Sequence, residues 1–286
     1  MGRHEMPSFA LNTMMNLQQT TRPITEDPEK KRIDDIIAET KLSPEGRAAL
    51  LFAEEYLIPY NQTRNQEWLI LEENEGEGAS FNPITRQTKL NPKLTNVYLA
   101  DALIHEIQHG AWLINPATKK PKLAEGRDSF IKFALDDEVL AHFTQYMSFR
   151  WRKSVVYRDN ETTLYALSSL KMCLISAMLD PIIERKLKEH GVSTKRKDTD
   201  LFLVNSKAKR AAFDELTKQF YEGDIGKNYR TRASNLYDKL LADPASARIF
   251  EDPPSAESTP ILSHASRLTF HLPDLPKFTP PARSRE

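Results

Sequence analysis

Glycine is scarce in this chain: only nine of its 286 residues are glycine. Tight turns use glycine heavily, because it adopts backbone angles that other residues avoid. A chain with so few glycines is expected to consist mainly of helices. The apolar residues agree with this, since they recur at helical spacing over most of the sequence. We therefore expect an α+β fold that is mainly α-helical.

The helical pattern begins at Asp27-Pro28 and covers most of the chain. Ser43-Pro44-Glu45 has the composition of a helix start: a capping serine, a proline at the first helical position and an acidic first turn. The helix that it opens is expected to stop before Pro59. Asp180-Pro181 is read as a second start of the same kind, with Gly191 as the stop. Other helices are expected near residues 95–112, 129–153, 162–179, 206–221 and 229–242.

A small sheet is expected between the first helices and residue 95. Trp68–Leu71 is an apolar run of strand length. Ala79–Phe81 and Thr88–Leu90 flank Asn82–Gln87, whose asparagine and proline are typical of a turn. These two segments therefore predict a hairpin.

The two ends of the chain differ in composition from its middle. Residues 1–25 are rich in Met, Gln and Thr without a clear period, and we expect a loose N-terminal arm. Prolines crowd in from about Asp252, and residues 246–286 are expected to form a disordered tail. The part between them, residues 26–245, is expected to fold as a single domain.

Charge and cysteine content narrow the partners and the compartment. The 40 Lys and Arg residues balance the 40 Asp and Glu residues, so no overall charge favours nucleic acid or an anionic membrane. Cys173 is the only cysteine, which excludes an internal disulfide and suits a reducing compartment. Neither a signal peptide nor a membrane-spanning apolar run is recognisable. We expect a cytoplasmic protein, or one exported by a route without such a signal, and the oligomeric state stays open.

His105-Glu106-Ile107-Gln108-His109 is the segment that indicates chemistry. Two histidines four residues apart lie on one face of a helix, one turn above the other. Their imidazoles can therefore converge on one zinc ion, with Zn–N distances of about 2.0–2.1 Å. Glu106 lies beside the first histidine, where it can accept a proton from a water molecule that the metal activates. The motif predicts a zinc-dependent hydrolase with His105 and His109 as metal ligands and Glu106 as general base.

A solvated helix face is the simpler alternative for the same residues, with Glu106 paired to a nearby lysine. The neighbouring apolar residues favour the metal site, because they would anchor the helix in the core and hold the ligands rigidly. These residues are Leu99, Leu103, Ile104, Ile107 and Trp112.

In this motif and the hairpin before it, the chain resembles the zincin metallopeptidases over about residues 68–150. It is especially similar to poorly characterised bacterial metallopeptidase domains with a Phe-Asn-Pro turn before the motif helix, here Phe81-Asn82-Pro83. The resemblance implies a small sheet whose edge strand pairs with an extended peptide or protein substrate. Residues 26–245 would then be a zincin-like catalytic domain, with a motif core at 68–150 and a helical half at 151–245.

The subclass bears on the third metal ligand. The metzincin pattern requires a glycine and a histidine after the second ligand, but this chain has Trp112 and Asn115 at those positions. Asn115 also stands where another subclass would use an aspartate. What remains is a carboxylate from a later helix, as in the gluzincins, and the segment Asp136–His142 is the best source.

Glu138 is the expected third ligand, with His142 and Asp137 as alternatives; a plain surface carboxylate is the simpler interpretation of Glu138. Many gluzincins have an aspartate four residues after the ligand glutamate, where it orients the first histidine. This chain has His142 at that position. Either Asp101 or Asp137 then takes the orienting role, or His142 itself approaches the metal.

Three questions stay open at the level of the sequence. The donor that stabilises the oxyanion is unassigned, with Tyr146 and Tyr165 available. A helical interaction or effector protein with an inactive or structural metal site is the alternative function. A peptidase restrained by its own N-terminal arm or proline-rich tail is a third possibility.

Overall fold

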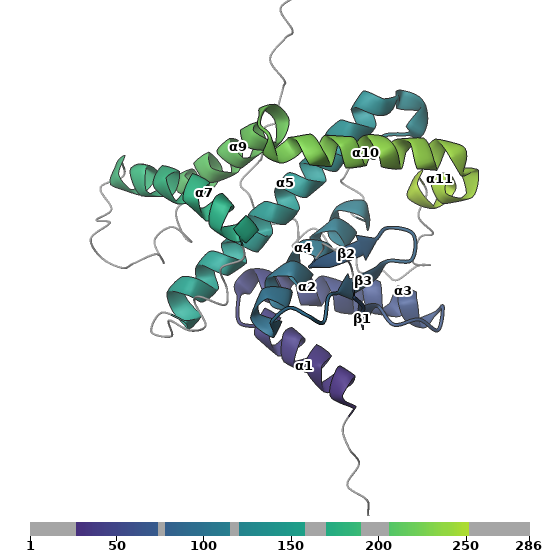
Figure 1. Cartoon of the computed structure of the whole chain (residues 1–286), viewed down its shortest axis with the longest axis horizontal. Helices are drawn as coiled ribbons and strands as arrows, with labels where there is room; N and C mark the ends of the chain where they lie inside the picture. The colour runs from purple at the N-terminus through teal and green to yellow at the C-terminus, as the bar shows by residue number, and fades with distance from the viewer. Residues whose placement is uncertain (1–26, 74–77, 115–119, 158–169, 190–205, 252–286) are drawn as a thin grey trace, which may run out of the picture.

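The computed structural model describes residues 27–73, 78–114, 120–157, 170–189 and 206–251. Within these residues, helices surround one three-stranded sheet (Figure 1), so the α+β, mainly α-helical class is confirmed. The α-helices are α1 (Pro28–Thr40), α2 (Pro44–Phe52), α3 (Ile58–Gln62), α4 (Asn96–Ile114), α5 (Arg127–Trp151), α7 (Leu170–Glu189), α9 (Ser206–Glu222), α10 (Ile225–Ala242) and α11 (Pro244–Glu251). Shorter helical segments are η1 (Ala53–Leu57), η2 (Leu123–Glu125) and η3 (Arg152–Val156). None of the helices in these ranges is long and apolar enough to cross a membrane.

The start of α2 follows the sequence prediction, but its end does not. The Ser43 side chain accepts a hydrogen bond from the Gly46 N–H at 2.9 Å, and Pro44 occupies the first turn. The expected stop before Pro59 is wrong, because the chain passes through the π-helical segment η1 directly into α3. Pro59 lies in the first turn of α3, directly after a π-helical segment in which the hydrogen-bond register of the backbone changes.

Two other helix boundaries differ from expectation. α7 continues through Pro181 as one helix, because the Asp180 carboxylate is bound to Tyr146 and Arg150 of α5 instead of capping a new helix. Residues 246–251, expected in the tail, are helical in α11. Asp243 starts this helix by accepting a hydrogen bond from the Ala245 N–H at 3.1 Å.

Some of the sequence predictions lie outside the described residues. They are the two ends of the chain, residues 1–26 and 252–286, the helix start expected at Thr162 and the helix stop expected at Gly191.

The sheet contains β1 (Leu69–Leu71), β2 (Ala79–Asn82) and β3 (Gln87–Leu90) in the order β1-β3-β2. β2 and β3 form the expected antiparallel hairpin. Asn82 builds its turn, since its side-chain oxygen accepts from the N–H groups of Ile84 and Thr85 at 2.9 and 3.1 Å. β1 pairs with the other side of β3 in parallel. β2 is therefore an edge strand, and it packs against α4.

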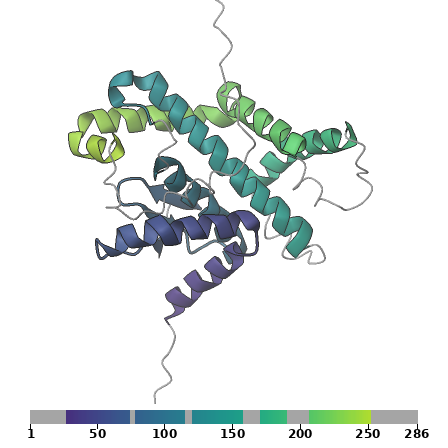
Figure 2. The ribbon, with the colours of Figure 1, turned by 180° about the vertical axis from the view of Figure 1, so that it is seen from behind.

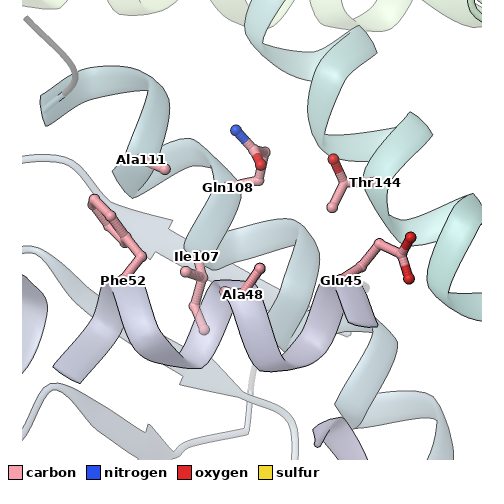
Figure 3. A pocket seen from close by; sticks show the side chains of 8 residues that line it. Glu45, Ala48, Phe52, Ile107, Gln108, Ala111 and Thr144 are labelled. Carbon is pink, nitrogen blue, oxygen red and sulfur yellow. The ribbon is translucent and has the colours of Figure 1, made fainter. Parts of the chain in front are cut away.

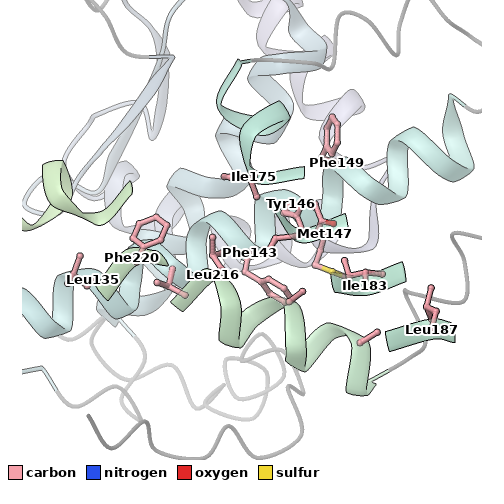
Figure 4. Packing of buried hydrophobic residues seen from close by; sticks show 14 residues of the cluster. Leu135, Phe143, Tyr146, Met147, Phe149, Ile175, Ile183, Leu187, Leu216 and Phe220 are labelled. Carbon is pink, nitrogen blue, oxygen red and sulfur yellow. The ribbon is translucent and has the colours of Figure 1, made fainter. Parts of the chain in front are cut away.

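Hydrophobic residues form one cluster where α4 packs against the N-terminal helices and the sheet, and another where α5 packs against α7 and α9. Residues of α1, α2 and the sheet pack with Leu99, Leu103 and Ile107 of α4. The view from behind shows α2 and α3 crossing this side of the molecule (Figure 2). The C-terminal half of α5 packs with α7 and α9 (Figure 4), where Tyr146, Leu216 and Phe220 are fully buried. The motif helix is thus held from several directions.

A buried arginine, Arg152 of η3, contacts both α1 and α4. Arg152 is fully buried, and its guanidinium contacts Asp101 at 2.5 Å and Glu39 at 2.7 Å. It also donates to the carbonyl oxygen of Val97 at 2.8 Å. This one side chain links α1, the first turns of α4 and the end of α5. Because buried charges are tolerated only when paired, the three helices are fixed relative to one another.

Candidate metal centre

The motif helix α4 and the acidic helix α5 pack side by side in opposite directions. Contacts along their length set the register: Asp101 with Ser148 at 3.0 Å, the rings of His105 and His142 at 4.3 Å, His109 with Asp137 at 2.9 Å, and the rings of Trp112 and Phe133 at 5.8 Å. The acidic residues of α5 therefore face the two histidines of α4.

His105, His109 and Glu138 are brought together as the sequence predicts. The Nε2 atoms of the two histidines are 3.1 Å apart. The carboxylate of Glu138 lies 3.6 Å from Nε2 of His105 and 3.9 Å from Nε2 of His109. A tetrahedral zinc ion with bonds of about 2.0–2.1 Å holds its ligand atoms about 3.3–3.4 Å apart. Two imidazoles and one carboxylate also form a donor set of catalytic zinc sites, so these residues fit the ion.

Asp137 contacts the same histidine from the opposite side. Its carboxylate lies 2.9 Å from Nδ1 of His109. When Nδ1 carries the proton of the neutral ring, Nε2 presents its lone pair towards His105 and Glu138, which is the tautomer that metal binding needs. Asp137 thus contacts the second histidine of the motif, and not the first, for which an orienting role was considered.

The carboxylates around His109 change its protonation. Burial lowers the pKa of His109, but Asp137, Glu138 and Glu106 raise it further, to about 10 against an ordinary value of 6.5. Burial in turn raises the pKa of the Asp137 carboxyl, which the charge of His109 opposes. These acids therefore favour the protonated form of His109.

Glu106 lines a cavity of about 750 Å³ together with the three candidate ligands. The cavity is lined by residues of β2, α4, α5, α7, α9 and α10. The Glu106 side chain is close enough to Tyr98, another residue of the lining, to act on it: burial and then the Glu106 charge raise the pKa of that phenol. The carboxylate expected to serve as base thus lies in the same space as the candidate metal ligands.

His142 is fully buried beside the site, but it differs from the three candidate ligands in its contacts. Its Nε2 lies 2.8 Å from the hydroxyl of Tyr229 and 3.6 Å from the Glu138 carboxylate. The grouping of donor atoms therefore favours Glu138 over the two alternatives, His142 and Asp137. His142 instead connects Glu138 to Tyr229 of α10.

Other residues considered from the sequence lie elsewhere. Asp101 pairs with Arg152 and accepts a hydrogen bond from Ser148, so it takes no orienting role at the histidines. Tyr146 is buried against Asp180 and Arg150 and is not among the residues that line the cavity. Tyr165 lies outside the described residues.

Tyr229 is the residue at the site that sequence reasoning missed. It lines the cavity from α10 and contacts a histidine 87 residues away in the chain. No local pattern marks it, because a tyrosine on an amphipathic helix is usually part of the packing. Only the placement of α10 across α5 reveals its position (Figure 1).

Gly110, directly after the second histidine, allows β2 to approach α4 closely. A β-carbon at this position would lie 3.2 Å from the ring of Phe81 in β2 and 3.4 Å from the side chain of Leu57. Such distances are tighter than ordinary carbon contacts, so a larger residue would push against the strand. The edge strand therefore lies directly over the turn of α4 that follows His109.

A second, much smaller cavity lies on the opposite side of α4, between α2, α4 and α5 (Figure 3). Gln108 of the motif and Thr144 of α5 border it together with Glu45. Its volume of about 10 Å³ has room for about one water molecule. Burial raises the pKa of Glu45, whose charge is partly compensated by Lys209. This space is too small for a substrate.

Comparisons with protein-family models, with curated proteins and with solved structures find no match to this chain. The interpretation of the site therefore rests on its motif, its donor atoms and their geometry.

Proposed function

We propose that this protein is a zinc-dependent metallopeptidase of the gluzincin type, in which His105, His109 and Glu138 hold the metal. The convergence of these three donors beside Glu106 in one cavity is the observation that carries the proposal. The His-Glu-x-x-His spacing and the zincin-like order of hairpin, motif helix and ligand helix support it. Asp137 would keep His109 in the tautomer that binds the ion.

The residues of the cavity have separate roles in peptide hydrolysis. A zinc ion held by His105, His109 and Glu138 would lower the pKa of a water molecule and polarise a peptide carbonyl. Glu106 accepts the proton that water loses as its oxygen attacks the carbonyl carbon. Glu106 then donates this proton to the leaving nitrogen as the C–N bond breaks. The burial of Glu106 and its neighbours limits competition from bulk solvent.

Tyr229 is the best candidate to stabilise the negative charge that develops on the carbonyl oxygen. It lines the cavity, and its hydroxyl is held at 2.8 Å by His142. When Nε2 of His142 carries the proton and donates to this oxygen, the hydroxyl keeps its own proton and can donate it to a developing oxyanion without reorganisation. The packing of Tyr229 against His142 and Phe220 supports a single orientation of its ring.

The edge strand β2 is suited to present an extended substrate. Residues 79–81 of β2 line the cavity, while their strand is paired with β3 on its other side. A peptide that adds to this edge would be fixed by backbone hydrogen bonds along the floor formed by α4. This pairing would hold the scissile carbonyl in one pose.

The test begins with metal analysis of protein purified without chelator or metal-affinity resin. About one zinc per chain is expected. Glu106→Gln should retain the zinc and lose peptide hydrolysis, because it removes the base but no ligand. His105→Ala should lose both zinc and activity. Full hydrolysis by Glu106→Gln would show that the general base is assigned wrongly.

The same measurements separate a peptidase from an interaction or effector protein with an inactive site. A structural zinc stabilises the fold, so EDTA would lower the melting temperature without any hydrolysis to abolish. Zinc well below one per chain, with no effect of EDTA on the melting temperature, would point to a protein whose motif does not bind metal.

A further inference from the structure

One wall of the main cavity is apolar over a continuous area. Side chains from three helices form it: Trp112 of α4, Phe130, Phe133 and Ala134 of α5, and Ala233 and Leu236 of α10. The rings of Trp112 and Phe133 pack at a centroid distance of 5.8 Å. Leu236 is 38% exposed although it is a large apolar residue, and it lies at this wall. We call these six residues the apolar wall.

The apolar wall begins one helical turn from the candidate metal ligands. Trp112 follows His109 by three residues on α4, and Ala134 precedes Glu138 by four residues on α5. Since the two helices run in opposite directions, both steps lead to the same side of the site. One turn spans about 5.4 Å. A substrate side chain next to the scissile bond can extend over a similar distance, so it would reach the apolar wall when the scissile bond lies at the candidate ligands.

The other end of the cavity combines polar and apolar groups, since Phe220 packs there against both His142 and Tyr229. His142 and Tyr229 lie there with the Glu138 carboxylate. In the described part of the chain, Arg232 is the only lysine or arginine in the cavity lining, and the carboxylates of the lining belong to the metal centre. The apolar wall itself therefore offers no charged group to a charged substrate side chain.

From this arrangement we infer that the cavity selects peptides with a large apolar side chain, such as leucine or phenylalanine, directly beside the cleaved bond. This inference rests on the proposed peptidase function and adds its substrate class. When that side chain packs against the apolar wall, its apolar surface leaves the water. Part of the exposed surface of Leu236 is covered at the same time. A carboxylate or ammonium in the same place would lose its hydration without gaining a partner among the six side chains of the apolar wall.

The test uses fluorogenic peptides that differ only at one residue beside the scissile bond. Each peptide carries leucine, phenylalanine, aspartate, lysine or glycine at that position, and kcat/KM is measured with the zinc-loaded protein. Leucine or phenylalanine should exceed aspartate, lysine and glycine at least tenfold. The same labelled peptides are then bound to zinc-loaded Glu106→Gln, where fluorescence anisotropy should give the same order of affinity without cleavage.

Leu236→Asp tests the apolar wall directly, and Leu241→Asp is its matched control. Both are exposed leucines of α10, but only Leu236 lines the cavity. Leu236→Asp should reduce the preference for leucine over lysine at least tenfold, whereas Leu241→Asp should leave it unchanged.

The outcomes keep the two proposals apart. Cleavage without any preference, or equal effects of the two leucine variants, would overturn the substrate class while leaving the peptidase intact. Zinc binding without cleavage of any peptide would count against the peptidase. In that case equal affinities for all the peptides would overturn the substrate class, and preferred binding of the apolar ones would support it.

Discussion

The carboxylate of Asp137 lies 2.9 Å from Nδ1 of His109, while the next residue, Glu138, faces Nε2 of the same ring at 3.9 Å. Consecutive residues of α5 thus contact the two nitrogens of one imidazole. This is possible because α4 crosses α5 with His109 directly opposite the two acids. If zinc binds as proposed, one turn of α5 supplies both the carboxylate that orients the ring and the carboxylate that completes the donor set.

Asp137→Asn is expected to weaken zinc binding about 10- to 100-fold, because an amide holds the imidazole less strongly than a carboxylate. Competition with a chromogenic chelator measures this change. Asp136→Asn is the control, since Asp136 pairs with Lys132 and Tyr221 outside the cavity lining. Equal zinc affinities of the two variants would show that Asp137 does not orient His109.

Tyr229→Phe is expected to reduce kcat about 100-fold, with KM and zinc content nearly unchanged, because the hydroxyl would act only on the developing oxyanion. Steady-state kinetics and metal analysis of the variant measure both. Tyr221→Phe removes a hydroxyl of similar burial that bonds to Asp136 instead of lining the cavity. A rise in KM at unchanged kcat would place Tyr229 in substrate binding alone.

Zinc binding is expected to release a proton near pH 7. The metal-free His109 is protonated there, because its pKa is raised to about 10, and a zinc ligand must be unprotonated. The zinc affinity should therefore increase with pH up to about 10. Calorimetric titrations in two buffers of different ionisation enthalpy count the protons. Asp137→Asn should release fewer, since its neutral amide no longer raises the pKa of His109.

Arg152→Met is expected to destabilise the fold by about 3–5 kcal/mol, because it leaves the carboxylates of Asp101 and Glu39 buried without their cation. Urea unfolding followed by circular dichroism measures this loss. Arg210→Met breaks a partly exposed pair with Asp214 and should cost at most about 1 kcal/mol. Similar losses in the two variants would mean that Arg152 does not fix α1 and α4.

The parts of the site that the sequence predicts are those with a local pattern. The motif helix follows from apolar residues at helical spacing, and the hairpin from a turn that Asn82 builds with its own neighbours. In these two elements the residues that decide the structure are close together in the chain. Glu138 is expected for another reason: the gluzincin resemblance implies a ligand carboxylate on a later helix, and the acidic segment Asp136–His142 supplies it, with His142 and Asp137 as alternatives.

The rest depends on contacts between distant segments, which leave no period in the sequence. The parallel pairing of β1 with β3 and the contact of Tyr229 with His142 are of this kind. The role of Asp137 could be considered but not assigned, because adjacent acids on a helix differ only by the rotation of about 100° that separates them. The helix boundaries predicted at Pro59 and Pro181 were wrong for the same reason, because tertiary packing decides whether a helix continues past a proline.

Gly110 has a consequence for the spacing between the strand that covers the cleft and the helix beneath it. A single methyl group at this residue would lift Phe81 by a few tenths of an ångström, and a branched side chain would lift it further. Because Phe81 lines the cavity, the width of the cavity beside β2 depends on the lack of a side chain at residue 110, although this residue offers no donor atom to the candidate metal site.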